Sequence, residues 1–73
     1  MQSQSDLEKA DRAFALAFEA EPTNPDILMK RAQNAVRMSQ PDRARQLYRQ
    51  IADREWQERF AAIIEQAKGL AER

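Results

Sequence analysis

The sequence predicts an all-α fold for this 73-residue chain, and three observations support that class. Helix-forming residues dominate, because Ala, Gln, Glu, Arg and Leu recur throughout. Strand-favouring residues are scarce, and Val36 is the single valine. Apolar residues recur at three- and four-residue spacing along four segments, which is the pattern of amphipathic helices. The chain has room for one small domain.

The first helix is predicted over residues 5–20, and two prolines mark its end. Pro22 stops this helix and Pro25 opens the next one, since proline lacks a backbone N–H and fits a first helical turn. Asn24 is the predicted N-cap of that next helix. The apolar stripe of residues 5–20 consists of Leu7, Ala10, Phe14, Ala17 and Phe18.

The second and third helices are predicted over residues 26–38 and 42–52, separated by a break at residues 39–42. Pro41 and Asp42 suit the start of the third helix. Because the connections are short, successive helices are expected to run antiparallel. The second stripe is Ile27, Leu28, Ala32, Ala35 and Met38, and the third is Ala44, Leu47, Tyr48 and Ile51.

The fourth helix is predicted over residues 56–71 and has the most regular apolar pattern. Asp53 is the predicted N-cap for it. Trp56 is expected to close the junction of the third and fourth helices against Tyr48 or Ile51. The apolar stripe is Trp56, Phe60, Ile63, Ile64, Ala67, Leu70 and Ala71.

An internal repeat runs through this pattern. Three residue pairs are 34 positions apart, namely Ala10 and Ala44, Phe14 and Tyr48, and Ala17 and Ile51. Pro22 follows Phe14 by eight residues. This arrangement resembles the second helix of the tetratricopeptide repeat family, whose period is about 34 residues. The resemblance implies one full repeat over residues 25–56, preceded by a second helix (5–21) and followed by a capping helix (56–71).

The first helix of that repeat departs from the family pattern. Arg31 stands where the family usually has leucine, and Ala35 where it usually has tyrosine. Trp56 stands at the second proline position. The resemblance implies a right-handed stack of about four antiparallel helices.

The family uses its first helices to line a groove for a peptide or a partner's helix. In this sequence the groove positions are Asp26, Met29, Gln33, Val36 and Arg37. Met29 and Val36 would offer apolar contact, whereas Gln33 and Arg37 would bond a peptide backbone or carboxylate. The family's lysine-and-asparagine carboxylate clamp is not expected, since Met29 and Gln33 occupy those positions.

Catalysis is not expected. The chain has no cysteine and no histidine, so Ser-His and Cys-His pairs are excluded along with thiolate and imidazole metal sites. No phosphate-binding glycine loop or calcium loop is present. Neither an enzyme activity nor a metal or cofactor is therefore predicted.

Charge is balanced overall but uneven along the chain. Residues 1–24 carry five acidic and two basic side chains, and residues 25–73 carry seven acidic and ten basic ones. The balance disfavours general attraction to nucleic acid. No membrane insertion is expected, and the lack of a signal segment in this chain favours the cytoplasm without establishing it.

The predicted function is a protein-binding scaffold whose groove comprises Met29, Gln33, Val36 and Arg37. One alternative is self-association into a homo-oligomer. Another is acidic-ligand or nucleic-acid binding through the Arg43–Arg59 face, which includes Arg43, Arg45, Arg49, Arg54 and Arg59; a solvated helix face explains those arginines as well.

Overall fold

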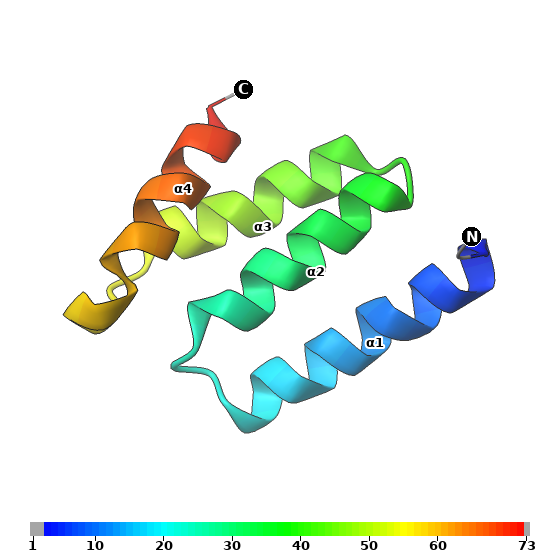
Figure 1. Cartoon of the computed structure of the whole chain (residues 1–73), viewed down its shortest axis with the longest axis horizontal. Helices are drawn as coiled ribbons and strands as arrows, with labels where there is room; N and C mark the ends of the chain where they lie inside the picture. The colour runs from blue at the N-terminus through cyan, green and yellow to red at the C-terminus, as the bar shows by residue number, and fades with distance from the viewer. Residues whose placement is uncertain (1–2, 73) are drawn as a thin grey trace.

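The computed structural model describes residues 3–72, which form four α-helices and one short 3₁₀ turn and contain no strand. This confirms the all-α class. The elements are α1 (Gln4–Ala20), α2 (Pro25–Arg37), α3 (Pro41–Asp53), η1 (Glu58–Phe60) and α4 (Ala61–Ala71). The helices pack in chain order, and α2 lies between α1 and α3 (Figure 1). The last helix, α4, packs against α3 and, less extensively, against α2.

The first two helices begin at side-chain caps. The Ser3 hydroxyl accepts a hydrogen bond from the Asp6 N–H at 3.2 Å, and the Asn24 side-chain oxygen accepts one from the Asp26 N–H at 3.0 Å. Each cap satisfies an N–H that the helix itself leaves free. The predicted N-cap role of Asn24 is confirmed, and Pro25 is the first residue of α2.

The turn between α2 and α3 is a Schellman motif. Ser39 has φ 60, in the left-handed region. The Gln40 N–H donates to the Ala35 carbonyl at 2.9 Å, and the Ser39 N–H donates to the Val36 carbonyl at 3.0 Å. These bonds satisfy carbonyl groups at the end of α2, and α3 then begins at Pro41.

The link between α3 and α4 differs from the prediction. Asp53 is the last residue of α3 rather than an N-cap, and α4 begins at Ala61, five residues later than the predicted start at residue 56. The Trp56 indole N–H donates to the Ile51 carbonyl at 2.8 Å. Since that carbonyl lies in the last turn of α3, the tryptophan bonds back to the end of α3 instead of opening α4.

The core lies between α2, α3 and α4. Alanines occupy many of its positions, which allows the helices to approach closely. Phe18, Trp56, Ile63, Ile64 and Leu70 pack around it as partly buried side chains. The buried members are Leu28, Met29, Ala32, Ala35, Ala44, Leu47, Tyr48, Ile51, Ala67 and Ala71.

Candidate functional site

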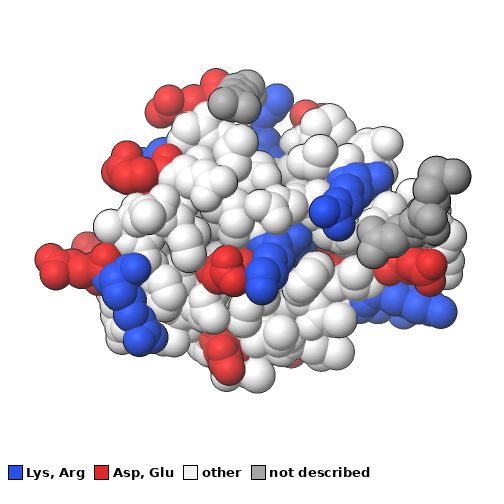
Figure 2. Space-filling model, viewed as in Figure 1, with Lys and Arg blue, Asp and Glu red and all other residues white. Residues whose placement is uncertain are grey.

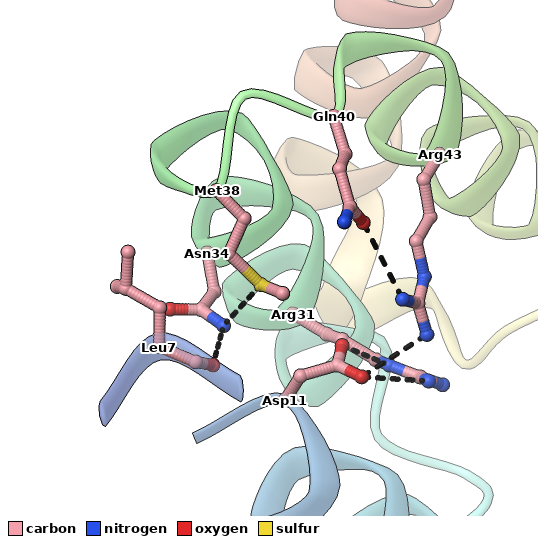
Figure 3. Close-up of polar contacts among 7 residues, drawn as sticks. All are labelled: Leu7, Asp11, Arg31, Asn34, Met38, Gln40 and Arg43. Carbon is pink, nitrogen blue, oxygen red and sulfur yellow. Dashed lines mark hydrogen bonds and ion pairs between the residues drawn. The ribbon is translucent and has the colours of Figure 1, made fainter. Parts of the chain in front are cut away.

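A buried carboxylate joins the first three helices. Asp11 of α1 is only 7% exposed. Arg31 of α2 donates to it from Nε at 2.8 Å and from Nη2 at 3.3 Å, and Arg43 of α3 donates from Nη2 at 3.0 Å. Arg43 also donates to the Gln40 side chain at 3.4 Å (Figure 3). One acidic group thus links α1 to both α2 and α3.

The two arginines make Asp11 a stronger acid. The hydrogen bond from Arg31 is the main cause of its lowered pKa, and the positive charges of Arg31 and Arg43 act in the same direction; burial opposes them. The Arg31 side chain is 23% exposed and that of Arg43 is 41% exposed. The cluster is therefore partly shielded from water, and its ion pairs hold the three helices together.

A second polar contact lies beside this cluster. Asn34 is buried and donates its side-chain N–H to the Leu7 carbonyl at 2.8 Å (Figure 3). The Met38 sulfur lies 3.5 Å from the same nitrogen. Because the Asn34 amide is paired with the backbone of α1, it helps to fix α1 on α2.

An aromatic cluster closes the other end of α1. The Phe18 and Trp56 rings meet edge to face with their centroids 6.4 Å apart. The Arg54 guanidinium lies over both rings, 5.6 Å from the Phe18 centroid and 4.8 Å from the Trp56 centroid. Trp56 therefore packs at the end of α3, as expected, but its ring partner is Phe18 of α1.

Of the four predicted groove residues, one is buried in the structure and three are exposed. Met29 is 4% exposed and belongs to the core that α4 completes, so it offers no surface to a partner in this arrangement. Val36 is 55% exposed, and Gln33 and Arg37 are also exposed. Gln33 and Arg37 line a small hollow of about 150 Å³ against Ala10 and Phe14 of α1, and Val36 lies on the adjoining strip of α2, three residues after Gln33.

A shallow hollow of about 190 Å³ lies beside Val36. Val36 lies near the end of α2, two helical turns after the buried Met29. The remaining lining comes from α3 and α4 and is mostly apolar, with one arginine: Pro41, Ala44, Arg45, Tyr48 and Leu70. We call Gln33, Val36 and Arg37 together with this hollow the Val36 surface.

The arginines from Arg43 to Arg59 do not form one face. Arg43 bonds Asp11, Arg54 covers the aromatic cluster, and Arg59 lies over the Phe60 ring at 4.8 Å. Arg45 and Arg49 instead line an open hollow of about 610 Å³ between α3 and α4. Its other lining residues are Ala52, Asp53, Lys68, Ala71 and Glu72. In Figure 2, basic and acidic side chains are interspersed on the visible face.

Residues 3–72 contain no group of three carboxylates or other ligands placed to hold a metal ion. Within the same residues, no helix combines the length and apolarity that crossing a bilayer requires. The polar contacts of Asp11 and Asn34 described above connect one helix to another. The surface left for a partner is therefore the exposed helix faces and the hollows between them.

Sequence reasoning missed the Asp11 cluster, although a signal for it was present. Asp11 follows Leu7 by four residues and precedes Phe14 by three, so it lies on the apolar stripe of α1. Arg31 likewise lies among Leu28, Ala32 and Ala35 on α2. Opposite charges within the facing stripes of neighbouring helices indicate a buried ion pair.

Comparison of the chain with protein-family models, with curated proteins and with solved structures finds no match.

Proposed function

We propose that this chain is a tetratricopeptide-type helical module that binds a protein or peptide at the Val36 surface. The single observation that carries the proposal is the 55% exposure of Val36 beside a mostly apolar hollow. A large apolar side chain at the edge of a concave surface gains free energy when a partner covers it.

The repeat supports the tetratricopeptide part of the proposal. Ala10 and Ala44 occupy corresponding positions in α1 and α3, and so do Phe14 and Tyr48. Both α1 and α3 pack against α2, as second helices do on either side of a first helix. Arg31 replaces the usual leucine, and the buried Asp11 carboxylate gives that arginine a partner.

The polar residues of the Val36 surface favour a partner of particular chemistry. Arg45 is an exposed cation that lines the hollow beside Val36. Arg37 is a second exposed cation, on the side of α2 that faces α1, and Gln33 beside it supplies both a donor and an acceptor for a peptide backbone. A short segment with one apolar anchor and a neighbouring acidic residue matches this arrangement.

A displayed library of random peptides tests the proposal. Peptides selected on the 73-residue chain are expected to lose binding to Val36→Glu, because a charge would enter the apolar hollow. Gln50→Glu introduces the same charge at an exposed position of α3 outside this surface and is expected to retain binding.

Amide chemical shifts of the labelled chain then locate the contact. Perturbations confined to α2 around Gln33–Arg37 and to Leu70 agree with the proposal. Selected peptides that bind Val36→Glu as well as the unaltered chain would overturn it, and so would perturbations scattered over all four helices.

A further inference from the structure

The outer face of α1 carries an exposed apolar strip. Leu16 is 66% exposed, the largest value among the big apolar side chains of the described residues. Ala13, three residues before it, and Ala20, four residues after it, lie on the same face and are also exposed. Ala17, predicted on the buried stripe, is exposed as well. Since α1 packs mainly against α2, at the edge of the stack in Figure 1, its opposite side is left uncovered.

Two opposite charges lie on either side of Leu16. Arg12 precedes it by four residues and Glu19 follows it by three, so the three side chains form a line along one face of α1. Within residues 3–72, neither charge has an oppositely charged group within 4.0 Å. The same holds for Lys9, which lies on the same face of α1, about two helical turns before Leu16.

This spacing is self-complementary when a second copy lies antiparallel. With a rise of about 1.5 Å per residue, Arg12 and Glu19 are about 6 Å and 4.5 Å from the level of Leu16. A two-fold axis near Leu16 reverses the second helix, so each Arg12 comes level with the Glu19 of the other copy.

A parallel pairing lacks this match. It would place Arg12 beside Arg12 and Glu19 beside Glu19, and like charges repel. The antiparallel arrangement instead gives two equivalent ion pairs and buries Leu16 of both copies at the centre, as a closed two-fold interface requires.

We propose that the outer face of α1 is a homodimer interface, in which two copies pair antiparallel through Leu16 with Arg12 of each facing Glu19 of the other. This goes beyond the binding of a partner at the Val36 surface, since it uses a different helix face. One helix per copy makes a small interface, so the dimer is expected to be weak and to require concentrations approaching about 1 mM for full association.

Sedimentation of two charge-reversed variants tests the geometry. Arg12→Glu alone places glutamates opposite each other, and Glu19→Arg alone places arginines opposite each other, so each variant is expected to be monomeric. Mixed in equal amounts, they are expected to form a heterodimer, because both cross-pairs are again opposite in charge. Recovery of association only on mixing identifies the Arg12–Glu19 pairing.

Two further variants act as controls. Leu16→Glu is expected to abolish association, whereas Gln50→Glu, with the same change of charge on α3, is expected to keep it. Equal helix content by circular dichroism shows that each variant folds. An unaltered chain that stays monomeric up to about 1 mM would overturn the proposal, and so would variant mixtures that stay monomeric or a dimer that survives Leu16→Glu.

The outcome is independent of the proposed partner binding. Val36→Glu is expected to leave the dimer intact, and Leu16→Glu is expected to leave peptide binding at the Val36 surface intact. Failure of either proposal can therefore be told apart from failure of the other.

Discussion

At the scale of single residues, Asp11 shows how a charge is accommodated inside an apolar interface. Its carboxylate receives hydrogen bonds from Arg31 and Arg43 and is therefore stable in its ionised form despite burial. Removing one partner of such a cluster leaves the others desolvated without compensation. The partial exposure of Arg43 limits that cost, because its guanidinium can turn toward water.

Asp11→Asn is accordingly expected to lower the free energy of unfolding at pH 7 by about 1–3 kcal/mol, measured by urea denaturation. Asp42→Asn is the matched control, since the Asp42 side chain is 92% exposed and its contact with Arg45 is long, at 3.7 Å. It is expected to lower the free energy of unfolding by less than Asp11→Asn does, by about 0.3–1 kcal/mol, because Asp42 is an exposed carboxylate in the first turn of α3. Equal losses in the two variants would contradict the structural role of Asp11.

The stability difference between the unaltered chain and Asp11→Asn is expected to depend on pH. The pKa of Asp11 is lowered in the folded state, so its ionised form stabilises the fold at pH values above the unfolded pKa. This stabilisation is lost as the pH falls from the unfolded pKa through the lower folded pKa. The difference in free energy of unfolding between the unaltered chain and Asp11→Asn should therefore become smaller in urea titrations repeated below about pH 4. A difference that stays constant with pH would contradict the lowered pKa of Asp11.

At the scale of elements, the ends of the helices are fixed by local chemistry. Asn24 with Pro25 starts α2, and Pro41 starts α3, as the sequence predicts. The start of α4 could not be predicted in this way. Neither Gln57 before η1 nor Phe60 before α4 forms a side-chain cap, and the position of Trp56 is set by contacts with Phe18 and Ile51.

Ser39 gives a test of the turn between α2 and α3. Its φ of 60 is unfavourable for a residue with a Cβ, whereas glycine adopts it without strain. Ser39→Gly is expected to raise the free energy of unfolding by about 0.5–1 kcal/mol in thermal or urea denaturation. Ser39→Val is expected to lower it, since a β-branched residue tolerates this conformation poorly. The opposite order of the two variants would argue against the Schellman turn.

At the scale of the whole molecule, the helices are stacked in chain order and the contacts are mainly between neighbours. The centre of the stack, α2 and α3, is packed on two sides, whereas α1 packs mainly against α2. In such an arrangement local stability is expected to be highest in the middle and to decrease toward the ends.

Amide hydrogen exchange measures this gradient. Protection is expected to be greatest in α2 and α3 and lower in α1 and α4 for the chain at low concentration. Protection of α1 is expected to rise with concentration if the proposed dimer forms, while that of α4 stays constant. Uniform protection of all four helices would indicate a single cooperative unit and would contradict the gradient.

The sequence by itself determined the all-α class, four helical segments and most of their ends, because composition, apolar periodicity and proline or asparagine caps act through neighbouring residues. Only the tertiary structure decided the position of side chains far apart in the chain. It buried Met29 in the core while leaving Val36 exposed, and it brought Arg31 and Arg43 to Asp11. Periodicity assigns a residue to a face of its own helix, but burial depends on how far the neighbouring helix extends over that face.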